Sequence, residues 1–158
     1  MTQPELWAVI LAGGRGLRFW PRSRRDRPKP ALALLTKKPL IVETVERLTG
    51  LVPSSRIFIS TSEATAGVFQ KALTKVPESQ YILEPEGRDT AAGIGLATVW
   101  LERRMAQAAA DSVLAVLPAD HVIARPRAFQ RTLATAAGIA AQEEVFVTIG
   151  VRPASPIH

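Results

Sequence analysis

The sequence contains no cysteine, which excludes disulfides and thiolate metal sites. It also lacks any apolar stretch of the roughly 20 residues that a membrane helix needs. The first residues, MTQPELWAVIL, show neither a basic n-region nor a small-residue cleavage site, so they do not resemble a secretion signal. These absences predict a cytoplasmic protein without a membrane partner, and 47% hydrophobic residues are ordinary for a globular domain.

The net charge of +6 comes from a single segment of the chain. Residues 15–29 carry seven cations against one acid, so all other residues together sum to zero. The cations are Arg15, Arg18, Arg22, Arg24, Arg25, Arg27 and Lys29. A nucleic-acid binder usually spreads such charge over a face or a helix, so this localisation predicts no nucleic-acid partner. For the four arginines from 22 to 27, a solvated patch is at least as good an interpretation as ligand contact.

Strand-like and helix-like segments alternate along the chain. Buried-strand patterns cover residues 6–11, 56–60, 81–83, 112–117 and 145–151, and helical patterns cover 40–48, 62–73, 90–110 and 126–142. Asp89 stands where the third helix needs an N-cap. Residues 1–158 therefore predict one α/β unit, a Rossmann-like and mainly parallel sheet with helices on both faces.

Three polar motifs follow predicted strands, and in a parallel sheet the carboxyl ends of the strands meet at one edge. They are the glycine and arginine loop after the first strand, EPEGRDTA at 84–91 and PADH at 118–121. Gly13, Gly14 and Gly16 let successive backbone N–H groups approach an anion. The loop lacks the last glycine of a dinucleotide fingerprint and the G-K-[ST] of a Walker loop. The motifs together predict a phosphate-binding edge.

The string LAGGRGLRFWPRSR followed by RPKP resembles the signature of the sugar-1-phosphate nucleotidyltransferases. Its FWP and SR residues are most similar to the mannose-1-phosphate guanylyltransferase branch. EPEGRDTAAGIGLA and LPADH resemble two further motifs of that branch, so the resemblance runs from about residue 8 to 151. It implies the nucleotide-diphospho-sugar transferase fold and the formation of GDP-mannose and pyrophosphate from GTP and mannose-1-phosphate, with magnesium as cofactor.

The resemblance also implies roles for particular residues. The catalytic set is Arg18, Lys29 and Asp120, and Asp120 is the magnesium ligand. The nucleotide-binding set is Leu11, Ala12, Gly13, Gly14, Gly16, Arg18, Lys29, Glu84, Arg88 and Thr90. Chemistry supports these roles. Arginine can make bidentate hydrogen bonds to the leaving β and γ phosphates, lysine places a point charge near the α-phosphate, and magnesium prefers carboxylate oxygen.

Glu84 is the expected specificity residue. Its carboxylate can accept hydrogen bonds from guanine N1–H and the N2 amino group, whereas a pyrimidine edge is read better by an amide. A solvated loop carboxylate is the alternative for Glu84, and a turn or helix-cap role is the alternative for Asp120. Arg88 is expected to contact phosphate or to pair with Glu86, and Trp20 to fill core rather than to support the base.

Some features depart from the family pattern. Asp89 stands in place of asparagine, and Ala92-Gly93 in place of proline-alanine. The sequence stops before the family's T-G-Y-G motif and its later aspartate, so we expect an incomplete and inactive N-terminal fragment without sugar-binding residues. A glucose-1-phosphate thymidylyl- or uridylyltransferase and a non-catalytic nucleotide-binding module stay open as alternatives, with a molybdenum-cofactor guanylyltransferase more distant. A homo-oligomer also stays possible.

Overall fold

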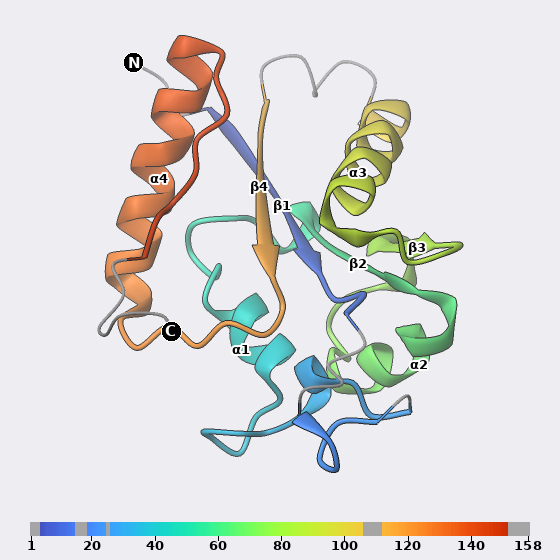
Figure 1. Ribbon diagram of the computed structural model, residues 1–158. Helices are drawn as coiled ribbons and strands as arrows, with labels where there is room; N and C mark the ends of the chain where they lie inside the picture. Colours follow the sequence, from blue (N-terminus) through green and yellow to red (C-terminus); the bar gives the residue numbers. More distant parts are fainter. Residues whose placement is uncertain (1–3, 15–18, 25, 106–111, 152–158) are drawn as a thin grey trace, which may run out of the picture.

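The computed structural model describes residues 4–14, 19–24, 26–105 and 112–151 (Figure 1). Its strands are β1 (Glu5–Leu11), β2 (Ile57–Ser62), β3 (Tyr81–Glu84) and β4 (Ser112–Pro118). Its helices are α1 (Leu40–Glu46), α2 (Glu63–Ala72), α3 (Asp89–Met105) and α4 (Pro126–Glu143). A short 3-10 turn, η2 (Lys29–Ala31), lies between β1 and α1. No helix among the described residues is both long and apolar enough to cross a membrane.

The four strands form one parallel sheet in the order β3-β2-β1-β4. The apolar run of β1 is central because both of its edges and both of its faces are covered, which suits a continuous hydrophobic strand. In register, Leu11 lies opposite Ser60 on one side and Pro118 on the other, and Ser62 lies opposite Glu84. The carboxyl ends of all four strands therefore reach one edge, as predicted.

Alternate residues of each strand point to opposite faces of the sheet, and the two faces carry separate cores. On one face α1, α2 and α4 cover a large cluster, to which β1 contributes Leu6, Ala8 and Ile10. On the other face α3 covers a smaller cluster that includes Trp7, Val9 and Phe58. Helices thus lie on both faces, which confirms the predicted fold class.

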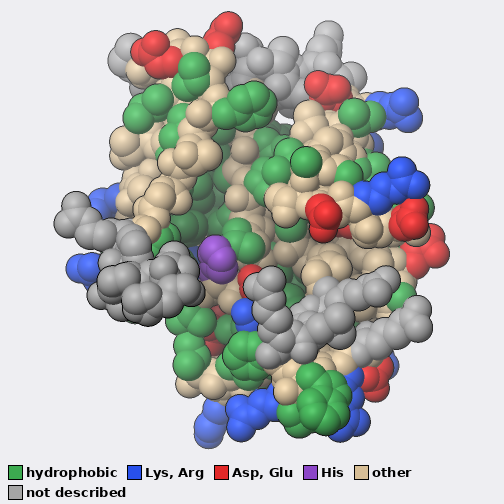
Figure 2. All heavy atoms as spheres, viewed as in Figure 1, with side chains coloured by type: hydrophobic (Ala, Val, Ile, Leu, Met, Phe, Trp, Pro, Cys, Tyr) green, Lys and Arg blue, Asp and Glu red, His purple; other side chains and the backbone are tan. Residues whose placement is uncertain are grey.

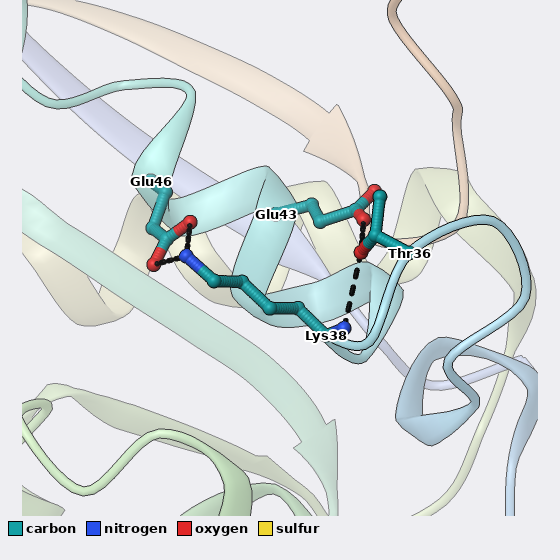
Figure 3. Close-up of polar contacts among 4 residues, drawn as sticks. All are labelled: Thr36, Lys38, Glu43 and Glu46. Atoms are coloured by element: carbon teal, nitrogen blue, oxygen red, sulfur yellow. Dashed lines mark hydrogen bonds and ion pairs between the residues drawn. The ribbon is translucent and has the colours of Figure 1, made fainter.

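The segment leading into α1 is held by short-range polar contacts (Figure 3). The backbone N–H of Lys38 donates to the Thr36 hydroxyl at 3.0 Å, and that hydroxyl donates to Glu43. The Lys38 ammonium lies 2.7 Å from both carboxylate oxygens of Glu46. Because Lys38 and Glu46 are about half exposed, this pair contributes little stability, and its effect is to hold the loop against α1.

The prediction of a fifth strand at residues 145–151 is wrong. Glu144 ends α4 in the left-handed region with φ of 52°, and the following segment runs back beside α4 (Figure 1). Phe146 is fully exposed and Val151 is 84% exposed. Alternating apolar residues have β propensity, but a strand also needs a partner for its backbone groups, and the described residues supply none here.

One helix start differs in detail from the prediction. Asp89 is the first residue of α3 rather than a cap before it, and its φ of 62° lies in the left-handed region, which aspartate and asparagine adopt more readily than other non-glycine residues. At the start of α2, the Ser62 hydroxyl lies 2.9 Å from the Thr65 hydroxyl and makes no bond to the helix backbone.

Candidate functional site

Two backbone hydrogen bonds carry the sheet pattern beyond the strand ends. Ala12 N–H donates to the Ser60 carbonyl at 2.7 Å, and Ala119 N–H donates to the Leu11 carbonyl at 3.1 Å. The start of the glycine loop therefore lies between the end of β2 and the PADH segment. Two of the three predicted motifs are thus adjacent.

The side chain of Glu84 lies on the α3 face of this edge, and the residue is only 9% exposed. The Ser60 hydroxyl donates to Glu84 Oε1 at 2.8 Å. A Cβ built on Gly13 would lie 3.2 Å from Oε2, and one built on Gly93 would lie 3.5 Å from Oε1. We call Ser60, Glu84, Gly13 and Gly93 the Glu84 cradle. It brings the glycine loop and the EPEGRDTA motif together around a buried carboxylate, so Glu84 is not a solvated loop residue.

Lys29 and Asp120 meet at the same edge although 91 residues separate them. Lys29 Nζ lies 2.8 Å from Asp120 Oδ2, and these side chains are 26% and 36% exposed. The ammonium also lies 5.2 Å from the centre of the Phe19 ring, within cation–π range. The short turn η2 and the buried Pro28 and Pro30 beside Lys29 restrict where its side chain can reach.

Helix α1 supports the PADH segment through contacts that the sequence did not reveal. The Arg47 guanidinium donates to the His121 carbonyl at 3.0 Å, and the Thr44 hydroxyl lies 3.4 Å from the Ala119 carbonyl. Burial lowers the pKa of Arg47, and nearby Glu43 opposes that shift. Arg47 is a buried cation that is partly satisfied by the His121 carbonyl, so it supports the segment that carries Asp120.

The remaining predicted site residues are placed less tightly. Arg88 pairs with Glu86, with Nη2 at 2.9 Å and Nε at 3.1 Å from one oxygen, and both side chains are about 70% exposed. Thr90 is exposed at the start of α3. Gly14 is open, with nothing within 4 Å of an added Cβ. Gly16 and Arg18 lie outside the described residues.

The loop after β1 is a cationic surface. Lys and Arg side chains gather at the lower end of the molecule, over the segment that follows β1 (Figure 2). Arg22, Arg24 and Arg27 are all exposed there, which agrees with a solvated patch. Trp20 is 75% exposed, so the expectation that it fills core is wrong. Residues 19, 21 and 22 beside Trp20 are exposed as well, so this stretch of the loop lies at the surface.

The described residues contain no group of three or more His, Cys, Asp or Glu side chains that could hold a metal ion. Asp120 is nevertheless a partly exposed carboxylate beside the start of the glycine loop. Magnesium commonly takes one or two carboxylates and completes its shell with phosphate oxygens and water. The residues present therefore fit a magnesium ion that arrives with a nucleotide.

A separate apolar pocket of ≈ 670 Å³ lies between α1 and the end of α2. Val45, Leu51, Ile57 and Leu73 are among its lining residues. None of the predicted site residues lines it, so it does not belong to the edge described above.

A parallel sheet with a glycine loop, a buried carboxylate and a lysine–aspartate pair at its carboxyl edge is typical of α/β domains that bind nucleotides. Residues 7–157 match the nucleotidyl transferase family, and the chain belongs to it. The resemblance seen in the sequence is thereby confirmed.

Named relatives agree with this family. The chain is 36% identical over 158 residues to mannose-1-phosphate guanylyltransferase of Escherichia coli strain K12, covering 99% of this chain and 32% of the relative. It is 37% identical over 149 residues to alginate biosynthesis protein AlgA of Pseudomonas putida, covering 94% and 30%. The chain thus spans about a third of the length of the curated relatives it matches.

Solved structures agree on the fold. The crystal structure of mannose-1-phosphate geranyltransferase from Thermus thermophilus superposes with a TM-score of 0.73 at 37% identity, over 84% of this chain and 37% of that one. A putative glucose-1-phosphate thymidylyltransferase from Bacillus anthracis superposes with a TM-score of 0.62 at 20% identity, over 83% and 51%, which shows the fold alone. The nucleotide-diphospho-sugar transferase fold is therefore confirmed.

Proposed function

We propose that this chain binds GTP for the synthesis of GDP-mannose. In that reaction an oxygen of the mannose-1-phosphate phosphate group attacks the α-phosphorus of GTP. A new P–O bond forms, the bond between the α-phosphorus and the bridging oxygen breaks, and pyrophosphate leaves. Family membership supports nucleotidyl transfer, and the similarity to mannose-1-phosphate guanylyltransferase of Escherichia coli favours this donor and acceptor.

The observation that carries the base assignment is the Glu84 cradle. One Glu84 oxygen accepts from Ser60, and the other faces the glycine loop without a protein donor among the described residues. Each carboxylate oxygen has two lone pairs, so both can still accept from a ligand. A buried carboxylate flanked by two glycines suits a flat edge that presents two donors, which is what guanine offers and a pyrimidine does not.

The phosphates are proposed to lie on the other side of the loop, toward Lys29 and Asp120. Nucleotidyl transfer needs positioning and charge stabilisation more than proton chemistry from side chains. Backbone N–H groups of Gly13 and Gly14 and the cations Arg18 and Lys29 would bind the triphosphate. Magnesium held by Asp120 would offset phosphate charge as the pyrophosphate leaves.

Calorimetric titration of the chain with GTP, ITP and UTP in magnesium tests the base assignment. ITP lacks the N2 amino group, so we expect tighter binding of GTP than of ITP or UTP. Replacing Glu84 with Gln should narrow the GTP-to-ITP difference by about 1 to 2 kcal/mol, the scale of one charge-assisted hydrogen bond. Equal binding of UTP and GTP would favour the thymidylyl or uridylyl alternative instead.

An assay for GDP-mannose and pyrophosphate tests the reaction itself. Product from GTP and mannose-1-phosphate, but not from glucose-1-phosphate, would support the proposal. Because we expect the chain alone to be inactive, this assay uses a protein of the relatives' full length. Absence of product there despite GTP binding would instead support the binding-module alternative.

A further inference from the structure

Three features of the described residues stand out: the ion pair of Lys29 with Asp120, the apolar pocket between α1 and α2, and the hydroxyl of Ser60. The ion pair belongs to the phosphate site already described. Nothing in the structure indicates an occupant for the pocket. Ser60 is different, because it is fully buried, belongs to none of the three motifs and contacts the proposed base-reading group directly.

We propose that Ser60 is the positioning residue for guanine specificity, and this inference rests on the proposed function. Its hydroxyl donates to Glu84 Oε1 at 2.8 Å inside a site where both residues are buried. A hydrogen bond to a charged group is stronger than one between neutral groups, and more so away from water. The bond therefore selects one rotation of the carboxylate.

The backbone of Ser60 ties the same residue to the nucleotide loop. Its carbonyl accepts from Ala12 N–H at 2.7 Å, one residue before Gly13. Gly13 in turn faces Glu84, with 3.2 Å between an added Cβ and Oε2. Ser60 thus holds the start of the glycine loop through its carbonyl and the Glu84 carboxylate through its hydroxyl.

The opposite side of the carboxylate faces Gly93 of α3. A Cβ on Gly93 would lie 3.5 Å from Oε1 and 3.8 Å from Leu11 Cδ2. Ser60 occupies one acceptor direction of Oε1, and the glycines leave space beside the carboxylate where other residues would place a Cβ. A ligand edge with two adjacent donors meets a carboxylate that is already oriented, so the Glu84 side chain loses little conformational entropy on binding.

Without the Ser60 hydroxyl the Glu84 carboxylate would gain rotational freedom. It would then discriminate less well between a base edge with two donors, as in GTP, and one with a single donor, as in ITP. A loss confined to packing would lower the affinity for every nucleotide by the same factor. A loss of positioning would lower the GTP-to-ITP affinity ratio. That ratio therefore separates the two roles.

The test is calorimetric binding of GTP, ITP and UTP to the chain carrying Ser60→Ala, Ser60→Cys or Glu84→Gln, and to the double variant Ser60→Ala with Glu84→Gln. We expect Ser60→Ala to reduce the GTP-to-ITP ratio by about threefold to tenfold. Ser60→Cys should fall between, because a thiol is a weaker donor. Added to Glu84→Gln, the alanine change should reduce the ratio no further, as expected for two groups that act through one contact.

Tyr81→Phe is the matched control, because it removes a buried hydroxyl from the adjacent strand and that hydroxyl has no partner among the described residues. It should leave the ratio unchanged. Thermal unfolding of each variant checks the fold, and the cysteine variant carries the test if the alanine variant does not fold.

An unchanged ratio in a folded Ser60→Ala protein would overturn the inference, as would a reduction of equal size in the Glu84→Gln background. Neither result would affect the proposed function. That proposal fails separately if the unmodified chain does not prefer GTP to ITP and UTP.

Discussion

The two ends of the candidate site differ in burial and in charge. The Glu84 cradle is buried, has one charged group and is bordered by a hydroxyl and two glycines, of which Gly13 would bring a Cβ to 3.2 Å from the carboxylate. The Lys29 and Asp120 pair is about one-third exposed, carries two opposite charges and can exchange partners with water or phosphate. The comparison indicates that the first end recognises shape and hydrogen-bond pattern, whereas the second responds to charge.

This contrast fits the proposed substrate. A purine edge has few donors in a fixed plane, so a rigid acceptor suits it. A triphosphate with magnesium is mobile and highly charged, so groups that can change partners suit it better. Lys29 and Asp120 neutralise each other in the structure, and each is available to a phosphate or a cation once that pair opens.

Asp120→Asn should have the largest effect. It removes the negative ligand proposed for magnesium, so transfer activity of a protein of the relatives' full length should fall by about 100-fold or more, measured as pyrophosphate release. It also frees Lys29, so GTP affinity measured in EDTA should stay the same or rise while affinity in magnesium falls. The melting temperature should change little, because a partly exposed ion pair contributes about 0 to 1 kcal/mol. Near-normal rates in magnesium would remove Asp120 from the metal site.

Arg18→Ala should come next. Loss of one charged hydrogen-bond donor is expected to weaken GTP binding by about 1.5 to 3 kcal/mol in calorimetry. GTP, ITP and UTP should be weakened alike, because the phosphates are common to all three. Arg22→Ala, in the exposed part of the same loop, is the matched control, and equal losses in both variants would mean that only overall charge matters.

Gly13→Ala tests the cradle from the loop side. Its Cβ would approach Glu84 Oε2 to 3.2 Å, so the carboxylate or the loop must shift. We expect a loss of about 1 to 2 kcal/mol in GTP binding, comparable to one charge-assisted hydrogen bond. Gly14→Ala has open space around its Cβ and should bind GTP nearly as well as the unmodified chain. Equal effects at the two glycines would argue that backbone freedom, and not contact with Glu84, requires glycine there.

Tyr81→Phe should have the smallest effect and concerns the strand that carries Glu84. Burial raises the pKa of Tyr81 to about 12, above the usual value of about 10 for an unfolded chain. Between these values the unfolded state loses the proton while the folded state keeps it. The contribution of Tyr81 to the free energy of unfolding is therefore fully present below about pH 10 and is lost as the pH rises toward 12.

Removing the hydroxyl should abolish that loss, which amounts to about 1 kcal/mol at pH 11. Urea unfolding of both proteins at pH 7 and pH 11 measures it. At pH 7 the phenylalanine variant should be at least as stable, since the buried hydroxyl makes no hydrogen bond in the described structure. A larger alkaline loss in the variant would contradict the assignment to Tyr81.

Much of the fold could be predicted because the patterns were strong and local. The continuous apolar run of β1 and the alternating strands and helices are sufficient for a parallel sheet and for the edge where the motifs meet. Residues 145–151 show the limit of that reasoning. Their alternation is as regular as that of a true strand, yet strand formation depends on a neighbour that local sequence does not reveal.

The sequence by itself determined which chemistry this chain carries: a glycine loop, a concentrated set of cations, and acids placed just after buried strands. Only the tertiary structure decided which of these groups meet. Lys29 reaches Asp120, and Ser60 and Gly93 enclose Glu84, because strands distant in sequence are adjacent in the sheet. Side-chain alternation places Ser60 on the α3 face, but its contact with Glu84 depends on the register of β2 against β3. That register is set by the packing of both faces of the sheet.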